Sequence, residues 1–167
     1  MPQSNRLGRA NLPCQLSNPL ESFYTVGLLV ALDDATGGRG EVAERVLVVE
    51  DNDLNRKLFC DLLRANGLTV EPVADGHNVL DIARSFEPDL VIMDIQLPNI
   101  SGVDLIEALK ADETLRRVPI LAVTAYAGKG DEDRIRQAGA EGYLSKPVSI
   151  QPFMNAVNAL LDRRAAA

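Results

Sequence analysis

The segment RVLVVEDNDLNRKLFCDLLRANG, residues 45–67, changes from a continuous apolar run to a helical period within a few positions. Residues 45–49 are apolar after the arginine, as expected for a strand that is covered on both faces. Residues 54–67 carry leucine and phenylalanine at helical spacing on one face, and Gly67 provides a C-terminal stop. The segment therefore predicts a buried strand followed by an amphipathic helix.

The same alternation repeats along the rest of the chain. Strands that are apolar throughout must be covered on both faces, which predicts an α/β fold with a doubly wound, five-stranded parallel sheet and five helices. The further strands are expected at 68–74, 89–94, 118–124 and 142–145, and the further helices at 76–86, 103–111, 131–138 and 150–162.

Position 45 also divides the 167 residues into parts of different character. Residues 1–44 are rich in turn-forming residues and predict a flexible or weakly structured extension. Residues 45–163 form the predicted domain, and 164–167 form a short tail. The apolar stretch 23–32 has about half of the ~20 residues that a membrane span needs, so no membrane insertion is expected. Residues 1–44 could be a tail, a partner anchor through 23–32, or an extension from a misassigned start codon.

The composition excludes several classes of partner. Lys plus Arg number 17 and Asp plus Glu number 24, which gives a net charge of −7. No run of basic residues is longer than two, so binding to nucleic acid or to an anionic membrane is not expected. The two cysteines, Cys14 and Cys60, lack the spacing of a zinc site or a disulfide framework. A reducing compartment, the cytoplasm, is expected.

Three carboxylates stand at strand ends. Glu50 and Asp51 follow the first strand, and Asp94 closes the third. In a parallel sheet these ends meet at one edge, where ligands collect. Like charges at ~4 Å repel by about 4 kcal/mol at an effective dielectric of 20, so a cation should share the cluster. Oxygen ligands of this kind favour Mg²⁺.

Two further groups reach the same edge. Thr124 ends the fourth strand and Lys146 follows the fifth. Each of these residues alone is common at a strand end or a turn. A carboxylate, a metal, a hydroxyl and an ammonium around one point can stabilise a phosphoryl group on Asp94.

Four blocks of the sequence resemble the receiver domains of bacterial two-component systems. They are VLVVEDND, DLVIMDIQLPNISG, PILAVTAYA and GYLSKPVS, and together they anchor residues 45–163. Within that family the chain is especially similar to a single-domain receiver of cell-division control, through EDNDLNRKLFCDLL and MDIQLPNISG. The resemblance implies a flavodoxin-like fold with strand order 2-1-3-4-5.

The resemblance also implies a role for each motif residue. Asp94 becomes the phosphoacceptor, and Thr124 and Lys146 become phosphate contacts. Thr124 and Tyr143 become a switch pair that couples the phosphoryl group to a distant surface. The Lys146–Pro147 peptide bond is expected to be cis. The implied metal ligands are Glu50, Asp51, Asp94 and the backbone carbonyl of Gln96.

The implied function is that of a switch and not of a metabolic enzyme. A histidine kinase or phosphotransfer protein supplies the phosphoryl group, and the receiver catalyses its own phosphorylation and dephosphorylation. Asn55, Arg56 and Pro147 are the expected docking residues, and bulky Tyr126 is expected to protect the phosphoaspartate from water. No output domain is expected after the last helix, so the signal is expected to pass to a downstream protein effector.

Two rival interpretations remain open at this point. A phosphorylation-independent adaptor would have the same fold without using the acceptor. An aspartyl-phosphate hydrolase would use Asp and Mg²⁺ with a nucleophile in a DxD pattern, which Asp51, Asn52 and Asp53 match superficially. Against the hydrolase, the chain lacks room for a substrate cap. Turnover of small phosphate esters would distinguish the hydrolase from the receiver.

Overall fold

The structure is a computed structural model that describes residues 43–125, 128 and 130–166. Residues 1–42 of the predicted extension, including the apolar stretch 23–32, lie outside the described residues, and so does Tyr126. The expectations for those positions stay predictions. Within the described ranges, no helix is long and apolar enough to cross a membrane.

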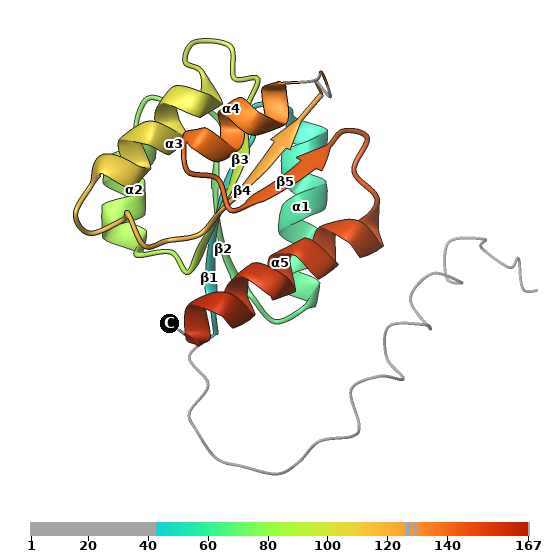
Figure 1. The fold of residues 1–167 in the computed structure, drawn as a ribbon. Helices are drawn as coiled ribbons and strands as arrows, with labels where there is room; N and C mark the ends of the chain where they lie inside the picture. The colour runs from blue at the N-terminus through green and yellow to red at the C-terminus, as the bar shows by residue number, and fades with distance from the viewer. Residues whose placement is uncertain (1–42, 126–127, 129, 167) are drawn as a thin grey trace, which may run out of the picture. The chain divides into compact units, whose positions relative to one another are not determined.

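Strands and helices alternate along the described chain from Arg45 onward (Figure 1). The strands are β1 Arg45–Val49, β2 Thr69–Val73, β3 Leu90–Asp94, β4 Ile120–Thr124 and β5 Gly142–Ser145. The helices are α1 Asp53–Ala65, α2 Val79–Phe86, α3 Gly102–Ala111, α4 Asp131–Gln137 and α5 Ile150–Ala165.

The strands form one parallel sheet in the order β2-β1-β3-β4-β5. This order confirms the predicted fold class. The chain reverses direction across the sheet between β1 and β3, because β2 lies outside β1 and all later strands add on the other side. Ligands of doubly wound sheets bind beyond the strand ends at such a reversal.

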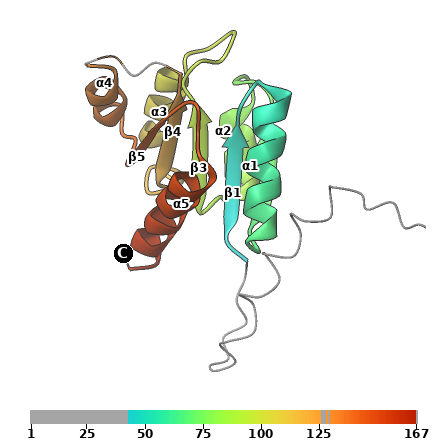
Figure 2. The same ribbon diagram turned by 90° about the vertical axis from the view of Figure 1, so that its right-hand side faces the viewer.

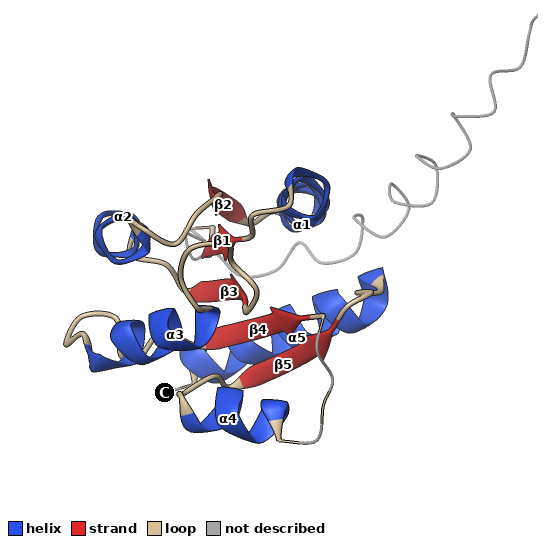
Figure 3. Cartoon of the chain, turned by 90° about the horizontal axis from the view of Figure 1, so that it is seen from above, coloured by secondary structure: helices blue, strands red, loops and turns tan. Residues whose placement is uncertain are grey.

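Helices cover both faces of the sheet (Figures 2 and 3). Helices α1 and α5 pack on one face, where the Phe59 and Phe153 rings stack with their centroids 4.8 Å apart. Helices α2, α3 and α4 pack on the other face. Successive side chains of β1 alternate between the two cores, with Leu47 on one side and Val48 on the other. This double cover explains why the central strands read as unbroken apolar runs.

Helix α2 begins three residues later than the sequence predicts, at Val79 instead of position 76. The N–H of His77 donates to Asp75 Oδ1 at 3.0 Å, which makes a turn before the helix. Gly76 is buried against Ile100, and a Cβ on it would collide with the Ile100 side chain. The glycine therefore serves a close approach between two loops rather than the first turn of α2.

The start of β4 and the end of α5 also differ from the prediction, by two and three residues. Strand β4 starts at Ile120 and not at 118, because the Val118 N–H donates to Leu115 in a turn and Pro119 has no N–H. Helix α5 continues past the predicted end at 162 as far as Ala165. Arg164 holds this last turn, since its guanidinium donates to the Pro88 carbonyl at 2.7 Å.

Candidate metal and phosphoryl site

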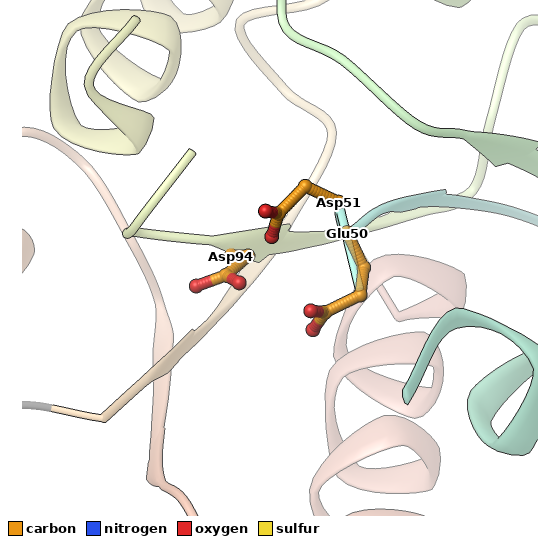
Figure 4. Close-up of side chains that lie close together, drawn as sticks. All are labelled: Glu50, Asp51 and Asp94. Carbon is orange, nitrogen blue, oxygen red and sulfur yellow. The ribbon is translucent and has the colours of Figure 1, made fainter. Parts of the chain in front are cut away.

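Three carboxylates converge where β1 and β3 end (Figure 4). Val49 pairs with Met93 in the sheet, so the residues that follow them leave the sheet side by side. One carboxylate oxygen from each of Glu50, Asp51 and Asp94 lies within 4.8 Å of the others. Glu50 and Asp94 are buried, whereas Asp51 is exposed. The predicted acidic cluster is therefore present, with one member open to solvent.

The loop between β1 and α1 is short and internally bonded. The side-chain oxygen of Asn52 accepts the N–H groups of Leu54 and Asn55 at 3.0 and 3.1 Å, which caps α1. The Glu50 N–H donates to the Val73 carbonyl at 3.1 Å, and the Asn55 amide donates to Glu50 Oε1 at 3.4 Å. The helix thus begins directly behind the carboxylates and fixes where they leave the strand.

Lys146 brings a cation to two of these carboxylates. Its Nζ lies 2.7 Å from Asp94 Oδ2 and 2.9 Å from Glu50 Oε2. Its backbone N–H donates to the Thr124 carbonyl at 2.7 Å, so the end of β4 positions the residue after β5. The Lys146–Pro147 bond is cis, as the resemblance implied.

Burial and charge act in opposite directions on this ion pair. Burial raises the pKa of the Glu50 carboxyl, and the hydrogen bond from Lys146 only partly offsets that effect. For Lys146, burial lowers the pKa, but the hydrogen bonds to Asp94 and Glu50 outweigh it and leave the pKa raised. The ammonium therefore keeps its charge at neutral pH. The sequence predicted that a cation must share the cluster, and the structure places the Lys146 ammonium against Asp94 and Glu50.

The remaining oxygen of Asp94 is held by the loop after β3. The backbone N–H of Gln96 donates to Asp94 Oδ1 at 2.9 Å. The expected role of the Gln96 carbonyl as a metal ligand stays a prediction. Gly102 was not among the predicted site residues, although it starts α3 directly after the capping Ser101. A Cβ at Gly102 would lie 2.7 Å from the Ile95 Cα and would meet the Asp94 carbonyl.

Thr124 and Tyr143, the predicted switch pair, lie on the adjacent strands β4 and β5. Thr124 is buried at the end of its strand, opposite Ser145. Tyr143 is half-buried and packs against the core that α2, α3 and α4 cover. Burial raises the pKa of the Tyr143 hydroxyl, with a smaller contribution from the carboxylates of α4. Their coupling stays a prediction.

Two of the three expected docking residues line a surface pocket, and the third, Arg56, contacts backbone carbonyls instead. Asn55 and Pro147 line a pocket of about 530 Å³. The Arg56 side chain is only 18% exposed and donates to the carbonyl groups of Glu50 and Asp51. The other residues of the pocket are Leu58, Phe59, Lys146 and Val148.

The hydrolase pattern does not converge on the site. The Asp53 side chain is 87% exposed and pairs with Arg56 on the first turn of α1. The described carboxylate cluster joins Asp51 to Glu50 and Asp94, and Asp53 is not part of it. The DxD spacing is therefore explained by a loop and a helix start.

Two similar proteins of known name are response regulators. The chain is 49% identical over 120 residues to the polar-differentiation response regulator DivK of Brucella ovis, covering 72% of this chain and 98% of the relative. It is 50% identical over 116 residues to the protein of the same name from Brucella anthropi, covering 70% of this chain and 94% of the relative.

Solved structures share the fold. The receiver domain of a sensor histidine kinase from Pseudomonas aeruginosa, with a magnesium ion coordinated in its active site cleft, is 34% identical with a TM-score of 0.67, covering 72% of this chain and 98% of that chain. A CheY-like response regulator receiver domain protein from Methanospirillum hungatei is 27% identical with a TM-score of 0.69, covering 74% and 98%. The family model for the response regulator receiver domain matches residues 46–158. The chain belongs to the response regulator receiver domain family.

Proposed function

We propose that the chain is the phosphoryl-accepting switch of a two-component phosphorelay, with Asp94 as the acceptor. One observation carries this proposal. The Lys146 ammonium bridges Asp94 and Glu50 at the ends of parallel strands, beside the exposed carboxylate of Asp51. A structural ion pair would need only one carboxylate, whereas an excess of negative charge around a fixed cation suits a metal and a phosphoryl group.

The donor set fits Mg²⁺. The three converging side chains offer only carboxylate oxygens, which hard divalent ions prefer. Asp51 is exposed, so the cluster is open to water and to an incoming phosphoryl group on that side. Glu50, Asp51, Asp94 and the Gln96 carbonyl would hold the ion. When bound, the ion neutralises charge on the oxygens of the transferring phosphoryl group.

The chain's own residues perform the transfer as follows. An Asp94 carboxylate oxygen attacks phosphorus, an O–P bond forms, and the P–N bond of the donor phosphohistidine breaks. The bonding electron pair stays on the imidazole nitrogen. The Gln96 N–H and the Lys146 ammonium orient the two oxygens of Asp94. Lys146 then offers its charge to the phosphoryl oxygens, and Thr124 offers a hydroxyl from the end of β4.

A docking surface for the phosphoryl donor lies beside the site. The pocket between α1 and the loop that follows β5 is lined by Lys146, the same residue that pairs with Asp94. Leu58 lines this pocket and is 42% exposed, and the other large exposed apolar side chains of the described residues, Leu54 and Ile150, lie on the first turns of α1 and α5. Exposed apolar groups around a functional pocket mark an interaction surface. We propose that it receives the histidine kinase or phosphotransfer protein.

The proposal extends to the setting of the switch. The relatives in Brucella are named polar-differentiation response regulators, which supports a role in cell-cycle or cell-division control. We place the protein in the cytoplasm, where histidine kinases carry out phosphotransfer. A downstream protein effector reads the phosphorylated state through β4 and β5, which carry the switch pair Thr124 and Tyr143.

Phosphotransfer profiling tests this function. Each purified histidine kinase of the source organism is loaded with [γ-³²P]ATP and mixed with the native chain and with Leu58→Asp. One kinase is expected to label the native chain, and Leu58→Asp is expected to lose about 10-fold in rate because a buried contact is replaced by a charge. Labelling by acetyl phosphate, which needs no docking, is expected to change by less than about twofold.

Ser85→Asp is the matched control, because it adds the same charge to exposed α2 on the other face of the sheet. It should be labelled like the native chain. Equal loss in both variants would contradict the docking surface. Failure of every donor to label the native chain would favour the adaptor, and turnover of small phosphate esters would favour the hydrolase.

A further inference from the structure

Arg56 contacts the backbone of the metal-binding loop rather than solvent. One guanidinium nitrogen donates to the carbonyl of Glu50 at 2.8 Å and to the carbonyl of Asp51 at 3.1 Å. The other terminal nitrogen forms an ion pair with Asp53. We propose that Arg56 is a positioning residue, whose guanidinium holds the backbone of Glu50 and Asp51 so that their carboxylates face Asp94.

Arg56 lies in the first turn of α1, which is capped by Asn52 and gives the arginine a fixed position behind the loop. Asn52 caps α1, and the Arg56 N–H donates to the Asn52 carbonyl at 2.9 Å within the first turn. The Arg56 side chain folds back from this turn onto the two residues before the cap. A rigid helix thus braces a loop of two acidic residues against their mutual repulsion. Groups that orient metal ligands typically change metal affinity by 10- to 100-fold when removed.

Charge alone predicts the opposite effect. A guanidinium close to a metal site repels a divalent cation, so its removal should tighten Mg²⁺ binding. The ion pair with Asp53 partly neutralises that charge, although Asp53 is well exposed and therefore screened. The two explanations differ in sign, which makes the role of Arg56 measurable.

This inference rests on the proposed function, because it presupposes that the carboxylates hold Mg²⁺. Isothermal titration calorimetry with Mg²⁺ alone, and Mn²⁺ binding followed by electron paramagnetic resonance, give the affinity of the full chain without any phosphorylation assay. Arg56→Met, which removes donors and charge, is expected to weaken binding by about 10-fold. Arg56→Lys keeps the charge and an N–H donor on a shorter side chain, so its Mg²⁺ affinity should lie between those of Arg56→Met and the native chain.

Two control variants separate positioning from stability. Arg64→Met removes another α1 arginine that donates to a carbonyl, that of Val70 at 3.3 Å, at the far end of the helix. Asp53→Asn breaks the ion pair and leaves the carbonyl contacts of Arg56. Both are expected to bind Mg²⁺ within about twofold of the native chain. Circular dichroism and thermal unfolding check that each variant is folded.

The possible outcomes are distinct. Arg56 does not position the loop if folded Arg56→Met binds Mg²⁺ as tightly as the native chain or more tightly. The same conclusion follows if Arg56→Lys binds Mg²⁺ more weakly than Arg56→Met. Loss of affinity in Arg64→Met equal to that in Arg56→Met would also overturn the inference. If the native chain does not bind Mg²⁺, or if Asp51→Asn binds it as tightly as the native chain, the proposed metal site itself is wrong.

Discussion

Lys146 Nζ lies 2.7 Å from Oδ2 of Asp94, although 52 residues separate the two in the sequence. The same ammonium lies 2.9 Å from Oε2 of Glu50, which directly follows β1. One lysine therefore ties together the ends of β1, β3 and β5. Its charge stabilises two buried carboxylates that would otherwise repel each other, and it stands where a phosphoryl group on Asp94 would need a cation.

Replacement of Lys146 by Met should lower stability and abolish phosphorylation while Mg²⁺ binding remains. Two buried carboxylates lose their cation, so the free energy of unfolding without metal is expected to fall by about 3–5 kcal/mol. The oxygens that hold Mg²⁺ remain, so Mg²⁺ affinity should be largely retained while labelling by acetyl phosphate is lost. Urea unfolding, calorimetry and phosphate incorporation measure the three quantities. Lys57→Met removes an exposed pair with Asp61 and should cost at most about 1 kcal/mol.

A collapse of Mg²⁺ affinity in folded Lys146→Met would show that the lysine supports the carboxylates rather than the phosphoryl group. Unchanged labelling would remove it from the proposed chemistry.

Gly102→Ala should damage the site through its backbone. The added Cβ would meet the Asp94 carbonyl and lie 2.7 Å from the Ile95 Cα, and a backbone contact cannot move aside as a flexible side chain can. We expect a loss of about 1–3 kcal/mol in stability and a marked fall in acetyl phosphate labelling. Gly67→Ala is the control, because its φ is +83° and no neighbouring atom lies within 4 Å of the added carbon. It should cost about 1 kcal/mol and leave labelling unchanged.

The pattern of apolar and polar residues along the chain predicted much of the fold and of the site at the strand ends. Apolar runs that alternate with helical periods required a doubly covered parallel sheet, and such a sheet gathers Glu50, Asp51 and Asp94 at one edge. No sequence pattern indicates that Lys146 is shared between two carboxylates. That arrangement depends on the backbone bond from Lys146 to Thr124, which sets how far the lysine reaches.

The contacts of Arg56 were beyond prediction for a related reason, whereas Gly102 was overlooked. A pattern of residue types reports which face of a helix is apolar, but it does not report that an arginine folds back on the preceding loop. The glycine had a visible signal, because it follows a capping serine at the start of α3, where a better helix former would be expected unless space is short.

Asp112 should make stability depend on pH in a defined direction. Hydrogen bonds from Thr114, and then from Arg84, hold the pKa of its carboxyl below the ordinary value. A group with a lowered folded-state pKa stabilises the fold above its unfolded pKa of about 3.9 and loses that contribution as the pH falls. Asp112→Asn should therefore unfold at a lower temperature than the native chain at pH 7, and the difference should shrink below about pH 4. A constant difference down to pH 2.5 would contradict the charge-based explanation.

Thr124→Ala tests the switch. Beryllofluoride with Mg²⁺ mimics a phosphoryl group on Asp94, and in the native chain it should shift the NMR signals of the Tyr143 ring. Without the threonine hydroxyl the mimic should still bind, but the Tyr143 shift should be lost because the hydroxyl that responds to the acceptor is absent. Equal shifts in both proteins would uncouple Tyr143 from the acceptor. An unresponsive native chain would favour the adaptor interpretation.

Direct location of the phosphoryl group tests the central claim. The native chain is incubated with acetyl phosphate and Mg²⁺, trapped with borohydride and digested, and the modified residue is identified by mass spectrometry. We predict a single modification at Asp94, which is absent after removal of Mg²⁺ and in Asp94→Asn, and present in Asp53→Asn. No modification of the native chain, or equal modification at another residue in Asp94→Asn, would contradict the account.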